Sequence, residues 1–380
     1  MNRLTLGLLA GLVVLLVQGG SIAAELQGLP TLTLPPGFKA EVWVDGVDNA
    51  RAMAYGNKGT LFVGSRKAGK VYALSDTNGD GRPDRVRVIA EGLNMPSGIA
   101  FRDGDLYVAE VQRIFKLVGI ESRLDAPPSQ TRVRDDLPTE THHGWRFIDF
   151  GPDGKLYVAI GAPCNVCPLA RFERDGRTLR YGSITRMDAD GRNWEVVADG
   201  VRNSVGFTWH PQTQKLWFTD NGRDWAGNEG PEDELNRVAK GNEGAFFGFP
   251  YCHAGSVADP EFGAQGRCSS AKAPAALLGP HVAPLGLAFY TGTQFPAEYR
   301  GNLFIAEHGS WNRSEKIGYR IQRVRIDASG QVIDQQPFAE GWLAGSQVSG
   351  RPADVLVAPD GALLVADDLG GRIWRIRYAP

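Results

Sequence analysis

Two adjacent histidines, His142 and His143, precede a short apolar segment in the stretch THHGWRFIDFGPDGKLYVAIG. Imidazole has an ordinary pKa near 6.5, so a histidine can remove a proton from a substrate close to neutral pH. A histidine placed immediately before an inner strand of a closed sheet would point into the mouth of its channel. The pair is therefore a candidate general base, and a structural histidine is the alternative that composition alone favours. His210 and His281 lie beside prolines in turns, and we assign them no chemistry.

Four cysteines fit an oxidising compartment. Cys164 and Cys167 form a C-x-x-C that is followed by Pro168, where a haem-attachment motif has histidine, and no second C-x-x-C supports a zinc site. The simplest of the possible pairings joins Cys164 to Cys167 and Cys252 to Cys268. We interpret both pairs as structural disulfides within loops, and a catalytic dithiol at 164 and 167 is the alternative.

The segment DTNGDG at 76–81, with Asp84 further on, resembles the opening of an EF-hand calcium loop. The glutamate expected at the twelfth loop position is replaced by Arg87. We therefore favour a plain turn built on Asp, Asn and Gly over a weak calcium site.

A repeat indicates the elements that must position these residues. A turn residue, a leucine, usually an aromatic residue and then small apolar residues recur as GTLFVGS at 59–65, GDLYVAE at 104–110, GKLYVAI at 154–160, QKLWFTD at 214–220, GNLFIAE at 301–307 and GALLVAD at 361–367. Each copy follows another short apolar segment. Each copy also precedes a segment of alternating character, such as KVYAL at 70–74 or RIWRI at 372–376. Period-two alternation bounded by Gly, Asp and Pro is typical of short antiparallel strands.

Six copies of a multi-strand unit predict an all-β fold, a six-bladed β-propeller of four-stranded antiparallel blades. The largest insertion lies between Thr219 and Pro284. The segment FKAEVWV at 38–44 could add a strand to the last blade and close the ring. A β-sandwich with coincidentally similar strands is the alternative. Binding groups of a propeller are expected on the loops at one face of the channel.

The first 24 residues have the pattern of a secretory signal peptide. Arg3 is followed by an apolar run at 4–17 and then by the small residues of SIAA at 21–24. The run is short for a membrane span, which needs about 20 residues. We therefore expect a signal peptide at 1–24, a propeller domain at 25–380 and a periplasmic or secreted protein, with an uncleaved anchor as the alternative.

The formal net charge is −2, with 41 basic and 43 acidic residues. Because acidic and basic residues are nearly equal in number, the composition indicates neither a basic surface for nucleic acid nor a polybasic surface for a membrane. We expect a small-molecule partner and no stable membrane insertion.

Four stretches resemble the soluble sugar dehydrogenases that use pyrroloquinoline quinone (PQQ), in particular their sorbosone-dehydrogenase-like branch: THHGWRFIDFGPDGKLYVAIGAPCNVC, GVRNSVGFTWHP, AEHGSWNRSEKIGYRIQRV and GRPADVLVAPDGALLVADD. The resemblance runs from about residue 34 to the C-terminus. The fold of that family is a six-bladed propeller, in agreement with the repeat. The resemblance implies PQQ and calcium as cofactors.

The resemblance also implies roles for individual residues. The general base of the family stands eight residues before a Gly-Pro-Asp turn, which is the position of His143, with His142 as the fallback. An Arg-Asn pair that lines the cofactor and substrate site is matched by Arg202 and Asn203. Arg202 would stabilise negative charge that develops on the quinone.

The cofactor and metal positions match less completely. A family Glu-Gln-Gly-Pro stretch, whose Gln meets the quinone and whose next carbonyls hold calcium, corresponds to DNGR at 220–223, so Asn221 would contact the cofactor and Gly222 and Arg223 would ligate the metal. At its last position this stretch has Arg where the family has Pro. EDELN at 232–236 resembles a second, structural calcium site with Glu234 as its carboxylate ligand, and a solvated acidic turn is the alternative.

Arg351 resembles an arginine that pairs with the carboxylates of the quinone, whereas Ala353 replaces a second family arginine. The cofactor lysine of the family has no secure match among His308, Arg313 and Lys316, and we take His308 and Arg313 as the contributors. These differences imply a substrate range that departs from that of the glucose enzymes.

The resemblance implies that His143 removes a sugar hydroxyl proton while hydride passes to the quinone, polarised by calcium. Because the chain has neither a haem motif nor a G-x-G-x-x-G fingerprint, electrons would leave to an external acceptor, a quinone or a cytochrome. A metal-dependent sugar lactonase and a non-catalytic binding propeller are the alternatives. Ligands for a lactonase metal could come from Glu110, Asn203, Asp220 and Glu307.

Overall fold

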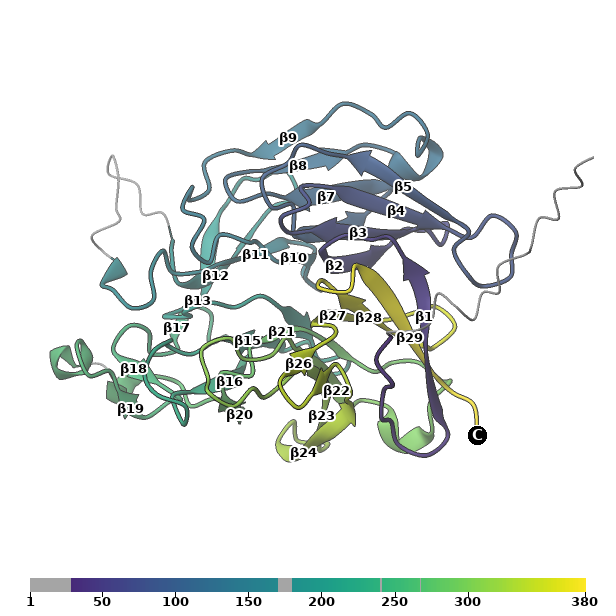
Figure 1. The fold of residues 1–380 in the computed structure, drawn as a ribbon. Helices are drawn as coiled ribbons and strands as arrows, with labels where there is room; N and C mark the ends of the chain where they lie inside the picture. Colours follow the sequence, from purple (N-terminus) through teal and green to yellow (C-terminus); the bar gives the residue numbers. More distant parts are fainter. Residues whose placement is uncertain (1–28, 170–179, 240, 267) are drawn as a thin grey trace, which may run out of the picture.

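The computed structural model describes residues 29–169, 180–239, 241–266 and 268–380. The predicted signal peptide at 1–24 lies outside the described residues. Within the described ranges, six sheets of four antiparallel strands, one of them extended by a short fifth strand, follow one another around a ring (Figure 1). The prediction of a six-bladed β-propeller is confirmed.

Each of the first three blades is formed by strands that are consecutive in the chain. Their strands are β2 (Ala50–Tyr55), β3 (Leu61–Ser65), β4 (Val71–Ser75) and β5 (Arg85–Ala90); β6 (Gly98–Arg102), β7 (Asp105–Ala109), β8 (Ile114–Leu117) and β9 (Thr131–Arg134); β10 (Ile148–Phe150), β11 (Leu156–Ile160), β12 (Ser183–Met187) and β13 (Glu195–Asp199). The short strand β17 (Ala245–Phe246) pairs in parallel with β13 at the edge of the third blade.

The last three blades contain the large insertion and the ring closure. Their strands are β14 (Phe207–Trp209), β15 (Leu216–Asp220), β16 (Glu232–Val238) and β20 (Ala276–Pro280); β21 (Pro284–Phe289), β22 (Leu303–Glu307), β23 (Arg320–Ile326) and β24 (Val332–Ala339); β27 (Pro352–Val357), β28 (Leu363–Asp367), β29 (Arg372–Tyr378) and β1 (Phe38–Asp45). Loops contain β18 (Cys252–His253), β19 (Val257–Ala258), β25 (Leu343–Ala344) and β26 (Gln347–Val348), with 3-10 turns η2 (Ile120–Ser122), η4 (Gly263–Gln265), η5 (Cys268–Ser270) and η6 (Ala297–Tyr299).

The ring is closed by the two ends of the described chain. Strand β1 pairs antiparallel with β29, from Phe38 opposite Tyr378 to Asp45 opposite Arg372, so the purple and yellow ends lie side by side in Figure 1. The expected contribution of 38–44 to the last blade is confirmed. Pairing removes an exposed strand edge from the last blade and fixes the first blade against it.

Successive side chains of the repeated strand point to opposite faces of the blade, and both faces are buried against neighbouring blades. In β3, Leu61 and Val63 pack into the cluster shared with the last blade, whereas Phe62 faces the cluster shared with the second blade. Equivalent clusters fill each of the other gaps between neighbouring blades. Burial of such side chains stabilises the fold by about 1.5–3 kcal/mol each.

The innermost strands approach one another so closely that glycine is required in places. A Cβ added at Gly286 of β21 would lie 1.9 Å from Asp354 Oδ1 of β27 in the next blade. The Asp354 carboxylate accepts a hydrogen bond from the backbone N–H of Met53, 2.9 Å away, and so links the fifth, sixth and first blades. These contacts hold the inner strands of the three blades against one another.

Both predicted disulfides, Cys164–Cys167 and Cys252–Cys268, are present. In the 76–84 loop the carboxylate of Asp76 accepts hydrogen bonds from the backbone of Gly79 and Gly81, and Asp84 accepts two from Thr77. These bonds match the plain turn that we favoured there.

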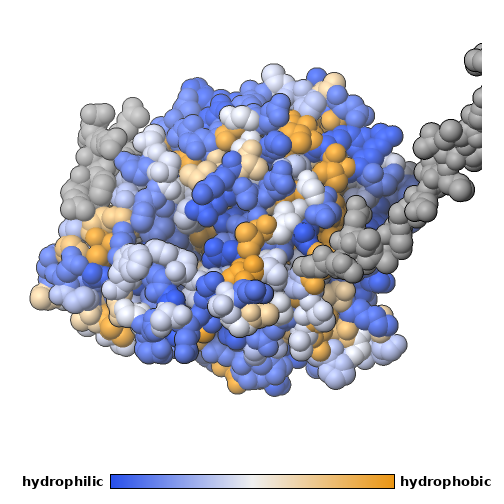
Figure 2. All heavy atoms as spheres, in the orientation of Figure 1, coloured by the Kyte–Doolittle hydropathy of each residue, from blue (hydrophilic) through white to orange (hydrophobic). Residues whose placement is uncertain are grey.

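The surface drawn in Figure 2 is mostly hydrophilic, with apolar residues scattered in small patches. Among the described residues, no helix has the length and apolar character that crossing a membrane requires.

Candidate active site

A cavity of about 490 Å³ lies at the end of the ring where the first strands of the blades begin and the second strands end. The antiparallel order of each blade brings these two sets of termini to the same end. The cavity is lined by Arg51, Arg66, Thr141, His142, His143, Trp145, Arg202, Asn203, Asn221, Asp224, Ala283, Leu285, His308, Trp311 and Arg351.

Six of the predicted site residues meet in this cavity. They come from five separate connections of the chain, and each stands at a strand terminus or in the loop beside one. They are His143, Arg202, Asn203, Asn221, His308 and Arg351.

The other four predicted residues lie outside the lining. The Arg313 guanidinium donates to the backbone oxygens of Asn228 and Glu315 and pairs with Glu229, so it joins two loops instead of facing the cavity. Gly222 and Glu234 border a small neighbouring space of about 10 Å³, which Arg202 and Asn221 of the cavity also line. The side chain of Arg223 is paired with Asp259.

His143 is held as a neutral base. Its Nδ1 lies 2.9 Å from the carbonyl oxygen of Ala162, and because a carbonyl only accepts, Nδ1 carries the proton and Nε2 keeps its lone pair. Burial, the nearby Arg202 and then His142 hold the pKa of His143 well below its ordinary value of 6.5, against a smaller opposite effect of the Ala162 bond. His143 is therefore unprotonated at neutral pH.

His142 stands beside His143, with ring centroids 4.1 Å apart, but it is exposed. The protein atoms around its partly covered ring, followed by Arg202, lower its pKa as well. The backbone of His143 has a φ of 50°, which is rare for a residue with a side chain. An added Cβ at Gly161 would lie 2.6 Å from the Cβ of His143, so the small residue at 161 makes room for this placement. The buried, oriented ring makes His143 the better base of the two.

Arg202 is buried and donates four hydrogen bonds. Nε and Nη2 donate to the backbone and side-chain oxygens of Asn165, both at 2.8 Å, and Nη1 donates to the carbonyl of Asn221. Nη2 also pairs with Asp224 at 2.8 Å. The carboxylate of Asp220 accepts the backbone N–H groups of Arg202 and Asn203, which fixes both residues at the cavity.

Arg51, His308 and Arg351 also line the cavity and are linked to one another through Asp368 and the backbone. Asp368 pairs with Arg51 at 2.7 Å and with the Nε2 of His308 at 2.9 Å. Burial lowers the pKa of His308 to about 4. The guanidinium of Arg351 donates to the backbone oxygens of His308 and Gly309.

Several buried polar atoms of the lining have no hydrogen-bond partner within the described residues. They are the Nε of Arg51 and of Arg66, the Oδ1 of Asn203 and the indole Nε1 of Trp145. The guanidinium of Arg66 lies over the Trp145 ring, 4.4 Å from its centroid. Buried donors and acceptors without partners are costly, so these atoms are available to a polar ligand. With four arginines and the single lining carboxylate of Asp224, the ligand that fits is an anion.

Two tryptophans form the rim. Trp311 lines the cavity and is 58% exposed, Trp225 is 71% exposed, and their ring centroids lie 5.0 Å apart. The loops that carry them are joined by the Arg313 bonds and by a hydrogen bond from Asn312 to Asp224. Paired, exposed aromatic rings at the mouth of a cavity mark a ligand-binding surface.

Sequence reasoning missed Arg51, Arg66, Trp145, Asp224, Trp311 and the supporting Asp368. For two of them, Arg66 and Asp368, the sequence repeat was informative. Both directly follow a seven-residue copy of the repeat, and the residues in that position all lie at this end of the ring. These residues are Arg66, Val111, Gly161, Asn221, His308 and Asp368.

The carboxylates considered for a lactonase metal are engaged elsewhere. Glu110 pairs with Arg113 and accepts the N–H of Asn94, and Glu307 pairs with Arg320. Asp220 accepts the backbone bonds described above. Among the described residues, no group of three or more His, Cys, Asp or Glu side chains is placed to hold a metal ion. Each of these carboxylates has at least one partner within the described residues, and the Oε1 of Glu307 is the buried oxygen among them that has none.

Comparison with known proteins gives consistent results. A family model described as glucose/sorbosone dehydrogenase matches residues 115–375. An uncharacterized protein of Borreliella burgdorferi is 32% identical over 379 residues, which cover 96% of this chain and 95% of that protein. The pyrroloquinoline quinone-dependent pyranose dehydrogenase of Coprinopsis cinerea is 33% identical over 406 residues, which cover 90% of this chain and 54% of that enzyme.

Among solved structures, the calcium structure of a Trichoderma reesei carbohydrate-active enzyme of family AA12 superposes with a TM-score of 0.77. The sequence identity is 20%, and the match covers 92% of this chain and 98% of that chain. At this identity the likeness shows a shared fold.

Proposed function

This chain belongs to the glucose/sorbosone dehydrogenase family, and we propose that it oxidises a sugar with pyrroloquinoline quinone bound in the arginine-lined cavity. The observation that carries the proposal is the state of His143. The ring is buried and neutral, and it lines a cavity suited to an anion. Its Nδ1–H is held by the Ala162 carbonyl, so Nε2 is the nitrogen that can accept a proton. A general base beside an anion site is what a quinone-dependent dehydrogenase requires.

The chemistry of the lining fits PQQ, which carries three carboxylates. Arg66 and Arg351 have no carboxylate partner within the described residues and would hold two of these groups, with Arg51 beside them. Asn203 and Asn221 would provide amide contacts to the ring system. The unpartnered buried atoms of Arg51, Arg66 and Asn203 support this assignment, because a polycarboxylate would satisfy the two guanidinium nitrogens.

Calcium belongs to the same proposal. The backbone oxygens of Gly222 and Arg223 directly follow Asn221 in the chain, and calcium accepts carbonyl ligands from any residue. Glu234 is a candidate for a second, structural ion. It lies opposite Asp220 in the β15–β16 pair, and burial, followed by Asp220, raises the pKa of Glu234 to about 8. A cation would relieve this repulsion between buried carboxylates.

The residues of the chain then have distinct tasks. His143 accepts the proton of the sugar hydroxyl at Nε2, while its Nδ1–H remains on the Ala162 carbonyl. Arg202 keeps His143 unprotonated beforehand and provides positive charge as negative charge develops in the site. When bound, the quinone supplies the two-electron acceptor for the hydride of the sugar carbon. The tryptophan rim offers apolar faces for a sugar ring and shields the cavity mouth from water.

We propose an aldose or a sorbosone-like sugar as the substrate, and an external quinone or a cytochrome as the electron acceptor. Export by the 1–24 signal peptide would place the protein in the periplasm or outside the cell. The two disulfides support an oxidising compartment.

A binding experiment tests the proposal before any substrate is known. Apoprotein titrated with PQQ in the presence of Ca²⁺ is expected to bind it saturably and to show a higher unfolding temperature, since a ligand that binds the folded state stabilises it. Absence of both effects would remove the assignment.

A further inference from the structure

One short segment, residues 161–167, contacts both candidate catalytic residues. The backbone N–H of Ala162 donates to the carbonyl oxygen of Arg202 at 2.8 Å, and the carbonyl oxygen of the same Ala162 accepts the Nδ1–H of His143. Three residues later, Asn165 accepts two hydrogen bonds from the Arg202 guanidinium. We call this segment the 161–167 bracket.

Asn165 uses every polar atom of its side chain. Its Oδ1 accepts from Arg202 Nη2 at 2.8 Å and from the backbone N–H of Asp224 at 2.9 Å. Its Nδ2 donates to the backbone oxygen of Asp224 at 3.0 Å. Asn165 thus joins Arg202, from the connection between β13 and β14, to the carboxylate residue with which Arg202 pairs.

The backbone around Asn165 is constrained by the disulfide between Cys164 and Cys167. A covalent link across three residues restricts the backbone of the two residues between the cysteines, so the positions of the Asn165 oxygens are set in advance. The disulfide is therefore part of the support of the cavity, although neither cysteine lines it.

We propose that Asn165 is a positioning residue of the active site, and that the Cys164–Cys167 disulfide holds it in place so that it fixes the Arg202 guanidinium beside His143. The proposal rests on the function proposed above. Neither Asn165 nor the cysteines touch substrate or cofactor in this arrangement, and they act through Arg202.

The arrangement has a consequence that a merely structural loop would lack. The charged and titratable groups that face His143 are Arg202 and His142, and Arg202 is the stronger influence on its pKa. If Asn165 releases Arg202, His143 is expected to become easier to protonate even in the apoprotein. This effect can be measured without cofactor, substrate or turnover.

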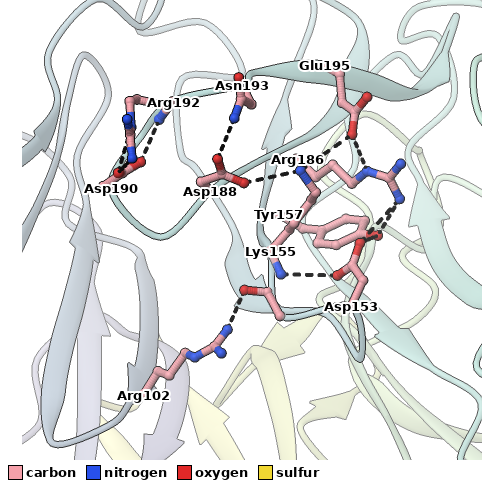
Figure 3. A network of polar contacts seen from close by, with 11 residues as sticks. Arg102, Asp153, Lys155, Tyr157, Arg186, Asp188, Asp190, Arg192, Asn193 and Glu195 are labelled. Carbon is pink, nitrogen blue, oxygen red and sulfur yellow. Dashed lines mark hydrogen bonds and ion pairs between the residues drawn. The ribbon is translucent and has the colours of Figure 1, made fainter.

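The experiment compares Asn165→Ala, Asn165→Asp and the double variant Cys164→Ser/Cys167→Ser in the full-length protein. Asn193→Ala is the matched control, because it too removes a hydrogen-bonding amide, which donates to the carboxylate of Asp188 in the network of Figure 3, away from the cavity. Thermal unfolding and circular dichroism establish that each variant is folded. The first readout is the pKa of His143 in apoprotein, by NMR with labelled histidine and assignment by His143→Gln.

The proposal expects a higher pKa of His143 in Asn165→Ala and in the cysteine double variant, and no change in Asn193→Ala. Asn165→Asp keeps a side-chain acceptor for Arg202 but adds a negative charge that itself favours the protonated ring, so the pKa of His143 should rise in this variant as well. An unchanged pKa in a folded Asn165→Ala variant would overturn the proposal.

Kinetics provide the second readout when the wild type oxidises a sugar. Asn165→Ala should lower kcat by about 10- to 100-fold with a smaller change in KM, as second-layer substitutions commonly do. Adding Asn165→Ala to Arg202→Ala should cost little more, because both changes remove the same interaction. Full additivity of the two effects would contradict the proposal. If the wild type oxidises no sugar, the proposed function fails, whereas the apoprotein titration still decides the role of Asn165.

Discussion

The Nδ1 of His143 lies 2.9 Å from the carbonyl oxygen of Ala162, and this contact determines which nitrogen of the ring can act as a base. It also joins the connection between β9 of the second blade and β10 of the third to the loop that follows β11 of the third blade. The tautomer of the base is therefore set by the packing of these two loops, and its charge is set by burial and by Arg202 from the connection between β13 and β14.

The first prediction concerns pH. Catalysis needs unprotonated His143, so kcat/KM falls as pH drops through the pKa of that residue. Because this pKa is held well below 6.5, activity should persist at pH 6.5 and decline only in more acidic buffer. Arg202→Ala removes one cause of the lowering, so the acidic limb should move to higher pH while burial keeps it below 6.5. If kcat/KM of Arg202→Ala declines at the same acidic pH as that of the wild type, Arg202 does not influence the pKa of His143.

The second prediction concerns cofactor affinity. Arg66→Ala removes a half-buried guanidinium whose buried Nε has no partner within the described residues, so PQQ binding to apoprotein should weaken by about 10- to 100-fold. The control is Arg192→Ala, which removes an exposed arginine paired with Asp190 in the network of Figure 3. Equal affinities of the two variants by isothermal titration would rule out Arg66 as a cofactor ligand.

The third prediction concerns the sugar. Trp311→Ala removes half of the aromatic pair at the cavity mouth, so KM for the best sugar of a panel should rise by about 3- to 10-fold. Affinity for PQQ should change less. If Trp311→Ala binds PQQ more weakly and its KM for the sugar is unchanged, Trp311 contacts the cofactor and not the sugar.

The fourth prediction concerns metal removal. Ca²⁺ added to chelator-treated apoprotein should raise the unfolding temperature and enable PQQ to bind. Glu234→Gln should reduce the thermal effect, because the glutamine keeps the size of the side chain and loses the charge that attracts a cation. If calcium stabilises Glu234→Gln as much as the wild type, the second ion does not use this carboxylate.

The architecture could be predicted from the sequence because the repeat encodes it directly. Six copies of a strand with alternating buried faces, such as Leu61 to Val63 in β3, dictate six similar blades, and the segment at 38–44 matched the missing outer strand. The disulfides were predictable because each pair is close in sequence.

The site could be predicted only in part, because its residues come from separate connections whose course depends on tertiary packing. His143, Arg202 and Arg351 were found by resemblance and converge at the cavity. Arg313 was expected there too, but its long side chain bonds the 228–229 loop instead. Arg66 was missed because a single arginine after a strand resembles an ordinary surface charge, although its place directly after the repeated strand was a usable signal.

The most direct test of the account is dye-linked oxidation of a sugar panel, aldoses and sorbosone included, by purified protein with and without PQQ and Ca²⁺, for the wild type and for His143→Gln. The account predicts oxidation that needs both additions and that falls by about 10²- to 10⁴-fold in His143→Gln, the range typical of a general base, while PQQ still binds. Oxidation that survives this substitution, or no oxidation of any sugar by a protein that binds PQQ, would contradict it.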